Sequence, residues 1–229
     1  ECERHVVWVD VDPSVHKGAL SAEASGVIAH AAATALHQRL PLVMSIASSG
    51  ADILGGIAAL HGWGQAARAL ADCSGVVPTI TIVTGPAVSG PALLIGLADF
   101  VIMTKESYAF VSGPTMVAEF TGVAISHDEL GGTDAHAKHS GVASLVVEDL
   151  AGAQAALEHL LTYLPNNVDE IATPLTSGDP SDRMLADGIA FVVPTTHKGE
   201  TVLRMCLVNP RTDPGQMQML YNSMRDSYA

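Results

Sequence analysis

The stretch TGPAVSGPALLIGLADF, residues 84–100, decides the fold class. It follows the apolar, β-branched run VVPTITIV at 76–83 and leads into small apolar residues that can wind into a helix. Gly and Pro interrupt the apolar pattern between the two, so the stretch predicts a strand, a tight turn and a helix. Such a turn leaves backbone N–H groups that can bind an anion or a developing oxyanion. The stretch therefore raises the question of which negative charge these amides bind.

The same strand–turn–helix unit repeats along the first two thirds of the chain. The apolar pattern predicts strands at 6–11, 42–47, 101–103 and 108–111, and helices at 21–40, 57–72 and 150–164. Repeated units of this kind predict an α/β fold, with a parallel or mixed sheet covered by helices. Residues 112–141 read as a loop, and Trp8 and Trp63 are expected in the core.

Three regions are expected in the domain organisation. Residues 1–171 are predicted to form one domain. The Pro, Thr, Ser and Gly content rises beyond it, so 172–182 is predicted to be a linker. Residues 183–229 form an extension that the sequence pattern does not assign to any fold.

Composition narrows the classes of function. The chain has 229 residues, of which 48% are hydrophobic and 15% charged, so it can bury a large core. It has no uninterrupted apolar run of about 18 residues, so no membrane span is expected. With 11 Lys and Arg, a net charge of -13 and no basic cluster, a nucleic-acid partner is not expected either. The surplus of apolar residues predicts a buried interface in an oligomer.

The cysteines and the first residues bear on cellular context. Cys2, Cys73 and Cys206 are isolated, which argues against a disulfide framework or a zinc ribbon and favours the reducing cytoplasm. The sequence starts at Glu1 without an initiator Met and shows no signal-peptide pattern. We therefore expect that the native start is missing.

Two turns are the main candidates for a functional site. Ser48–Ala51 and Ala87–Gly90 each follow a predicted strand, and ligands of α/β proteins gather at the carboxyl ends of strands. A purely structural role stays open, because Gly and Ser also simply permit tight turns. Neither turn has the pattern of a nucleotide phosphate loop or a dinucleotide fingerprint. No GxSxG pattern surrounds their serines, so a hydrolase triad is not predicted.

The polar stretch before residue 141 offers further titratable groups. It contains no HExxH pattern, so no metal site is predicted from its histidines, His127, His136 and His139. Its carboxylates are candidates for acid–base chemistry, although an acidic chain also carries many carboxylates that are only solvated. These carboxylates are Asp128, Glu129 and Asp134.

Several segments together resemble a known family. They are CSGVVPTITIVTGPAVSGPALLIGLADFVIM at 73–103, SGP at 112–114, ELGGTDAHAKHSGVAS at 129–144 and YLPNN at 163–167. In order and spacing they are similar to the amino-terminal half of the carboxyltransferase (β) subunits of biotin-dependent acyl-CoA carboxylases, of the propionyl-CoA and acetyl-CoA type. The resemblance covers about residues 6–170.

The resemblance implies a fold and a reaction. The fold would be the crotonase-like ββα superhelix, in a single domain followed by the unassigned extension. The reaction would move a carboxyl group from carboxybiotin to the α-carbon of an acyl-CoA, while backbone amides stabilise the thioester enolate and no metal takes part. Biotin would come on a separate carrier protein. The expected partners are therefore acyl-CoA, the biotin carrier and biotin carboxylase subunit, and a carboxy-terminal carboxyltransferase half or homologous subunit.

Site residues also follow from the resemblance. By position, the family's Gly-Gly amide pair falls on Ser89 and Gly90, which would be the catalytic residues. The residues expected to bind substrate are Ser49, Gly50, Ala51, Gly113, Gly131, Gly132 and His136.

Three positions depart from the family pattern. Asp52 stands where Arg is usual, Ser89 where Gly is usual, and Ser144 where His is usual. An Asp in place of Arg repels the phosphates of CoA instead of attracting them.

Two alternatives stay open. One is a crotonase-like acyl-CoA decarboxylase or hydrolase that acts alone, with a side-chain base such as His136. The other is a catalytically silent structural subunit of a carboxylase complex, which the departures at Asp52 and Ser89 favour.

Overall fold

The computed structural model describes residues 4–171, the strands at 193–197 and 200–204, and the single positions 215, 218 and 222. Contacts within the chain divide it into two units, 1–172 and 173–229. In the second unit, β7 (Val193–His197) and β8 (Glu200–Arg204) form an antiparallel pair. The linker predicted at 172–182 lies outside the described residues. In the described part, no helix has the length and apolar character needed to cross a membrane.

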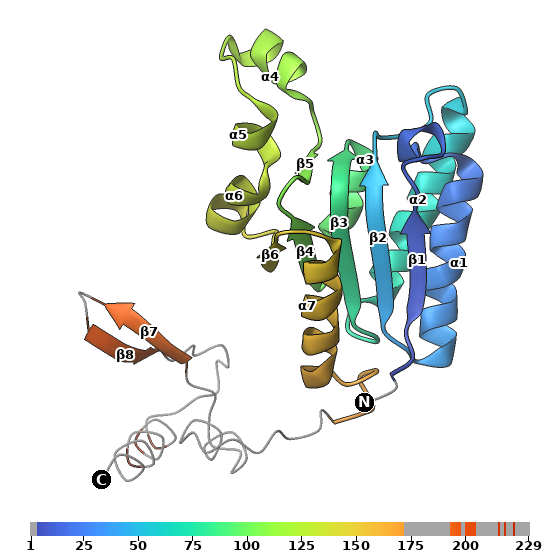
Figure 1. Cartoon of the computed structure of the whole chain (residues 1–229). Coiled ribbons are helices and arrows are strands. Elements are labelled where there is room, and N and C mark those ends of the chain that lie inside the picture. The colour runs from blue at the N-terminus through green and yellow to red at the C-terminus, as the bar shows by residue number, and fades with distance from the viewer. Residues whose placement is uncertain are drawn as a thin grey trace. The chain divides into compact units, whose positions relative to one another are not determined.

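A six-stranded parallel sheet organises the first unit, which confirms the predicted α/β class (Figure 1). Its continuous path runs through β1 (Val7–Val11), β2 (Leu42–Ser48), β3 (Thr79–Val88), β4 (Phe100–Thr104) and β6 (Leu145–Val147) in that order. The sixth strand, β5 (Tyr108–Phe110), pairs with the far end of β3. Strand β6 was not predicted; it has three residues, and its side chains are exposed or only half-buried.

Helices cover both faces of this sheet (Figure 1). On one face, a core cluster joins the sheet to α1 (Ala22–Gln38), α2 (Gly56–Cys73) and α3 (Gly90–Ile95). On the other face, a second cluster joins it to α7 (Leu150–Tyr163). Successive side chains of a strand point to opposite faces, so both faces of the central strands are apolar, as in other buried parallel sheets.

The two tryptophans differ in burial. Trp63 of α2 packs against the larger core cluster, as predicted. The prediction for Trp8 is wrong, because this side chain is 44% exposed. Trp8 lies on the edge strand β1, on the opposite face from the buried Val9 and Val11.

Small residues let α1 and α2 approach each other closely. A Cβ atom on Gly62 would lie 2.9 Å from the Cα atom of Ala22, so no larger residue fits there without a shift of the helices. The alanine-rich composition of both helices thus has a packing reason.

Strand β3 does not end where the sequence predicted. Gly85 and Pro86 were expected to break the strand, but it continues to Val88. Ile46 pairs with Val83 and Ser48 with Ala87, so an advance of two residues along β2 corresponds to four along β3. The pairing of the two strands is therefore irregular at this point. A proline is tolerated at such an irregularity because the ladder is interrupted there.

The predicted loop at 112–141 is wrong, because the structure forms short helices there. They are α4 (Pro114–Thr121), α5 (His127–Gly131), α6 (Thr133–Ala135) and a π-helical turn (His136–Ser140). A capping box starts α5: the Ser126 hydroxyl accepts the Glu129 N–H at 3.2 Å, and the Glu129 carboxylate accepts the Ser126 N–H at 2.9 Å. The Ser126 N–H, and the Ser126 hydroxyl that donates to the same carboxylate, lower the pKa of Glu129. Such short helices carry too few apolar positions to show a helical period.

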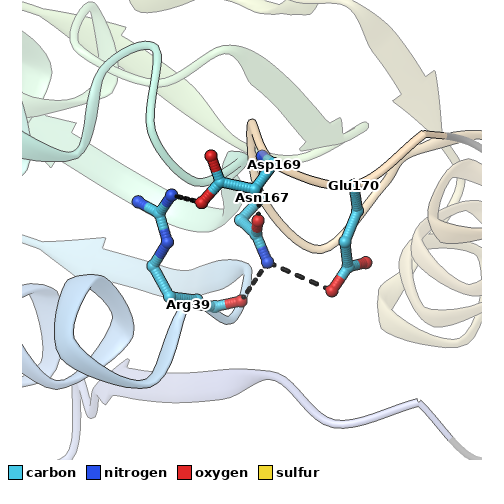
Figure 2. A network of polar contacts seen from close by, with 4 residues as sticks. All are labelled: Arg39, Asn167, Asp169 and Glu170. Atoms are coloured by element: carbon cyan, nitrogen blue, oxygen red, sulfur yellow. Dashed lines mark hydrogen bonds and ion pairs between the residues drawn. The ribbon is translucent and has the colours of Figure 1, made fainter.

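The segment after α7 is hydrogen-bonded to two distant parts of the chain, and Figure 2 shows its bonds to Arg39. The amide nitrogen of Asn167 donates to Arg39 O at 3.0 Å and to the Glu170 carboxylate at 3.1 Å, while its oxygen accepts the Asp169 N–H at 3.0 Å. The Val168 N–H donates to Val76 O at 2.9 Å. The residue that ends α1 and the loop before β3 are thereby held by one short segment.

We predict that Asn167→Ala lowers the free energy of unfolding by about 1–3 kcal/mol, because it leaves buried hydrogen-bonding groups without a partner. The matched control is Asp169→Ala, which removes an exposed ion pair with Arg39. That change is expected to cost less than about 1 kcal/mol. Urea unfolding followed by circular dichroism measures both, and equal losses for the two variants would contradict the prediction.

Candidate functional site

The two predicted turns meet at the carboxyl ends of β2 and β3. Ser48 pairs with Ala87 in the parallel ladder. A Cβ atom on Gly50 would lie 3.4 Å from Val88 O and 3.8 Å from the Cβ of Ser89. The structure thus brings together five of the expected site residues, Ser49, Gly50, Ala51, Ser89 and Gly90. We call residues 48–52 and 88–90 the β2–β3 junction.

Most backbone N–H groups of the junction already have an acceptor. Ser89 N–H donates to Phe110 O at 2.9 Å, and Ser49 N–H donates to Lys17 O at 3.0 Å. Gly50 N–H donates to the Ser48 hydroxyl at 3.3 Å. The Ser89 amide is therefore not a free donor, which differs from the expected Ser89–Gly90 pair.

Two amides of the junction remain free. Within residues 4–171, the N–H groups of Ala51 and Gly90 have no acceptor. They come from different turns, one after β2 and one after β3. Two donors from neighbouring turns can bind one oxygen, so the arrangement suits an oxyanion site.

The Ser89 backbone is held in an unusual conformation. Its φ of 62° and ψ of -121° lie where glycine is at ease and other residues are rare. Such strain costs about 1–3 kcal/mol and persists only where the surroundings enforce it. Here the bond to Phe110 O and the start of α3 enforce it. The side chain itself is exposed.

The indole ring of Trp63 packs against Gly90 of the junction. A Cβ atom on Gly90 would lie 2.7 Å from Nε1 of Trp63 and 2.9 Å from its Cδ1. A larger residue at 90 would therefore displace the indole ring. Sequence reasoning placed Trp63 in the core but missed this support, because nothing in the sequence links position 63 of one helix with position 90 of another.

The remaining predicted site residues gather around β5, beside the junction. A Cβ atom on Gly131 would lie 2.1 Å from Ala109 O, and one on Gly132 would lie 2.7 Å from Asp128 O. Both positions thus need glycine for close packing of α5. Gly113 is the N-cap of α4, and a Cβ atom on it would lie 3.7 Å from the Phe110 ring.

His136 ties the π-helical turn to β5. Its Nε2 lies 2.8 Å from Ala109 O, and its Nδ1 lies 2.8 Å from the Ser140 hydroxyl. A carbonyl oxygen only accepts, so Nε2 carries a proton, and in the neutral ring Nδ1 accepts from the hydroxyl. With both ring nitrogens engaged, His136 does not present a free base.

Other titratable groups of this region are also engaged. The His127 ring lies 5.1 Å from that of Tyr108 and 5.6 Å from that of Phe110. The Lys138 ammonium pairs with Asp134 at 2.8 Å, which lowers the pKa of that carboxyl. Within the described ranges, no three His, Cys, Asp or Glu side chains gather as metal ligands would.

An apolar hollow of about 440 Å³ opens beside the junction. It lies between α3, β5 and the π-helical turn, and Ala92, Ile95, Phe110, Val117, Leu130 and His136 are among its lining residues. Ala92 is two residues from Gly90, and Phe110 pairs with Val88. A mainly apolar wall close to the free amide of Gly90 suits a ligand that has an apolar part and an oxygen to bind.

Two of the departures from the family pattern have local structural roles. Asp52 accepts the Leu54 N–H at 3.1 Å and so starts the turn into α2. The Ser144 hydroxyl accepts the Val101 N–H at 3.1 Å, and Ser144 N–H donates to Val101 O at 2.8 Å, which ties the chain before β6 to β4.

Comparison with known proteins identifies the family. The model of the carboxyl transferase domain matches residues 3–218, which extends beyond residue 170, where the resemblance in the sequence ended. The methylmalonyl-CoA carboxyltransferase 12S subunit of Propionibacterium freudenreichii subsp. shermanii is 40% identical over 133 residues, 58% of this chain and 25% of that protein. The human mitochondrial propionyl-CoA carboxylase beta chain is 32% identical over 177 residues, 77% of this chain and 33% of that protein.

Solved structures agree. A crystal structure of the transcarboxylase 12S hexamer with hydrolysed methylmalonyl-coenzyme A bound is 36% identical, with a TM-score of 0.71 over 74% of this chain and 34% of that one. The beta subunit of the P. aeruginosa geranyl-CoA carboxylase, at 23% identity and a TM-score of 0.64, shares the fold. The chain thus spans about a quarter to a third of the length of these relatives. With this crotonase-like α/β fold and a family match over most of its length, the chain belongs to the carboxyl transferase domain family.

Proposed function

We propose that the chain is the acyl-CoA-binding part of a biotin-dependent carboxyltransferase, which moves a carboxyl group from carboxybiotin to the α-carbon of an acyl-CoA. One observation carries the proposal: in a member of this family, two neighbouring βα turns each offer a free N–H, at Ala51 and Gly90. The similar 12S structure has a hydrolysed methylmalonyl-CoA bound, which supports an acyl-CoA as the ligand.

The two free amides would bind the thioester oxygen of the acyl-CoA. When the α-proton leaves, negative charge moves onto this oxygen, and donors already aimed at it stabilise the enolate more than the ground state. Loss of one such donor typically costs about 3 kcal/mol of transition-state stabilisation. The acyl chain would lie in the neighbouring apolar hollow.

Biotin, bound to a separate carrier protein, would supply the carboxyl group. The site suits such a division of roles, because the junction offers free N–H donors, while the histidine that lines the apolar hollow, His136, is engaged at both ring nitrogens. Removal of the α-proton is therefore assigned to the incoming co-substrate. The junction's part is to bind the thioester and to hold the developing charge.

The hydrolase and decarboxylase alternative needs a side-chain base in this chain, and the hydrogen bonds of His136 count against it. The silent-subunit alternative was favoured by Asp52 and Ser89. Asp52 has a structural role, because its carboxylate accepts the Leu54 N–H. Ser89 adopts the backbone conformation that glycine favours, so the turn keeps its shape despite the serine. The observations thus favour the carboxyltransferase reading.

A partner would complete the site. The matched part of the chain covers only 25% and 33% of two of its relatives, so a carboxy-terminal half or a homologous subunit is the expected partner, together with the biotin carrier and biotin carboxylase. Exposed apolar side chains after β2 support an oligomer, since Ile53, Leu54 and Ile57 are 90%, 97% and 86% exposed. A cytoplasmic location is supported by Cys73, which is a free thiol and forms no disulfide.

Reconstitution tests the proposed function. The full chain is incubated with short acyl-CoAs and a biotin carrier that bears a labelled carboxyl group, with and without a carboxy-terminal carboxyltransferase half. We expect acyl-CoA binding by the chain alone and transfer of label only in the complete mixture. Hydrolysis or decarboxylation without the carrier would instead establish the single-enzyme alternative, and neither binding nor transfer would establish the silent subunit.

A second prediction separates positions 89 and 90. Gly90→Ala is expected to lower turnover about 100-fold, because the new Cβ collides with Trp63 and moves a free amide. Ser89→Gly is the matched control: it should keep turnover and raise the free energy of unfolding by about 1 kcal/mol, because it relieves the positive φ. Steady-state kinetics and thermal melting measure both.

Ser89→Ala tests the serine hydroxyl itself. The carboxyltransferase reading expects most activity to remain in this variant, because the junction acts through the amides of Ala51 and Gly90. An inactive Ser89→Ala protein with an unchanged melting temperature would make Ser89 a nucleophile and would overturn the amide mechanism.

The oligomer is tested at the apolar turn after β2. Replacement of Ile53, Leu54 and Ile57 by Ser should shift the full chain toward smaller species in light scattering, because a buried interface loses its apolar contacts. The control is Val168→Ser, a change at another exposed apolar position, 64% exposed. A wild-type chain that stays monomeric at micromolar concentration would count against the oligomer.

A further inference from the structure

Lys17 differs from the other cations of residues 4–171. Arg39 pairs with Asp169, Arg68 with Asp72, Lys105 with Glu148 and Lys138 with Asp134. Arg4 donates to Asn166 and to Leu161 O. Lys17, the sixth Lys or Arg in these residues, is exposed and forms neither an ion pair nor a side-chain hydrogen bond there.

The backbone of Lys17 is fixed to the β2–β3 junction. Its carbonyl oxygen accepts the Ser49 N–H at 3.0 Å. The next carbonyl, of Gly18, accepts the buried Ser48 hydroxyl at 2.6 Å. A Cβ atom on Gly18 would lie 2.0 Å from Ala47 O, so this turn rests directly on β2. The backbone of Lys17 is thus bonded to Ser49, which lies two residues before Ala51 and its free amide.

The turn that carries Lys17 is strained. His16 and Lys17 have φ of 47° and 55°, and Gly18 follows with 68°. Left-handed conformations are easy for Gly and Asn and costly for Lys. A residue that keeps its side chain at such a cost is a candidate for a functional role, because strain of this kind clusters at ligand sites.

Electrostatics indicate what Lys17 contacts. The chain has a net charge of -13, and the carboxylates of Asp10, Asp12 and Asp52 belong to the same end of the sheet. Asp12 is held by the Ser14 N–H and hydroxyl, and Asp52 by the Leu54 N–H. Asp52 also occupies the position where a cation is usual in the family. A polyanionic ligand that reaches the free amides would therefore meet repulsion on the Asp52 side.

We propose that Lys17 binds the phosphate groups of the CoA portion of the substrate, in place of the cation that Asp52 has replaced. The inference rests on the proposed function, because it takes the ligand of the junction to be a CoA thioester. A lysine suits this role, since its ammonium is a point charge on a flexible stem and needs no fixed fork geometry. Lys17 is then a specificity residue for the charged end of the ligand, separate from the amides that hold the thioester.

Calorimetric titration of the full chain with CoA, dephospho-CoA and pantetheine tests the proposal. Lys17→Asn removes the charge and keeps a residue that tolerates the left-handed conformation, so the fold should survive. We expect it to weaken CoA binding about tenfold and to leave pantetheine binding unchanged. Lys17→Arg should retain CoA binding. Lys105→Asn, which removes another exposed lysine, should leave both affinities unchanged.

The outcomes separate the two proposals. Equal CoA affinity in wild type and Lys17→Asn, or no preference of the wild type for CoA over pantetheine, would overturn the role of Lys17 while the proposed function stands. Loss of both CoA and pantetheine binding in Lys17→Asn would show a general disturbance of the junction and would also overturn it. A wild-type chain that binds neither CoA nor pantetheine would overturn the proposed function and this inference together.

Discussion

The parallel pairing of β2 with β3 is the constraint on which the rest of the first unit depends. Parallel strands end at the same edge of the sheet, so the two turns that follow them must be neighbours, whatever the intervening helix contributes. Strand β3 then extends past the end of β4 and pairs with β5 along its last residues. The same strand thereby joins the core to the turn before Gly90 and to β5, whose Ala109 and Phe110 line the apolar hollow.

Much of this arrangement could be predicted from the sequence. The near-continuous apolar runs at 42–47 and 76–83 and the small residues after them indicate buried parallel strands that end in tight turns. These local patterns bring Gly50 and Gly90 to one edge. The predicted loop at 112–141 was wrong because its helices are too short for a period, although Ser126 and Glu129 have the spacing of a capping box.

Other features depend on contacts between distant residues and could not be predicted. No pattern in the sequence shows that the Ser89 N–H donates to Phe110 O, or that Trp63 lies against Gly90. Whether an amide is free is decided by the partner strand, so the choice between Ser89 and Ala51 as the second donor required the ladder between β3 and β5. The sequence indicates where a turn lies, and the packing around it decides which groups remain available.

The segment after α7 has a consequence for how the domain is made. Its bonds join Arg4 with Asn166 and Arg39 with Asn167, which are 162 and 128 residues apart. During synthesis, the first strand and helix leave the ribosome long before these partners exist, and contacts of such long separation form slowly. Strand β1 can pair with β2 earlier, but the bonds of Arg4 and of Arg39 O to this segment can form only after the chain has grown past residue 167. A nascent chain arrested before that point would expose the base of the sheet to chaperones and proteases.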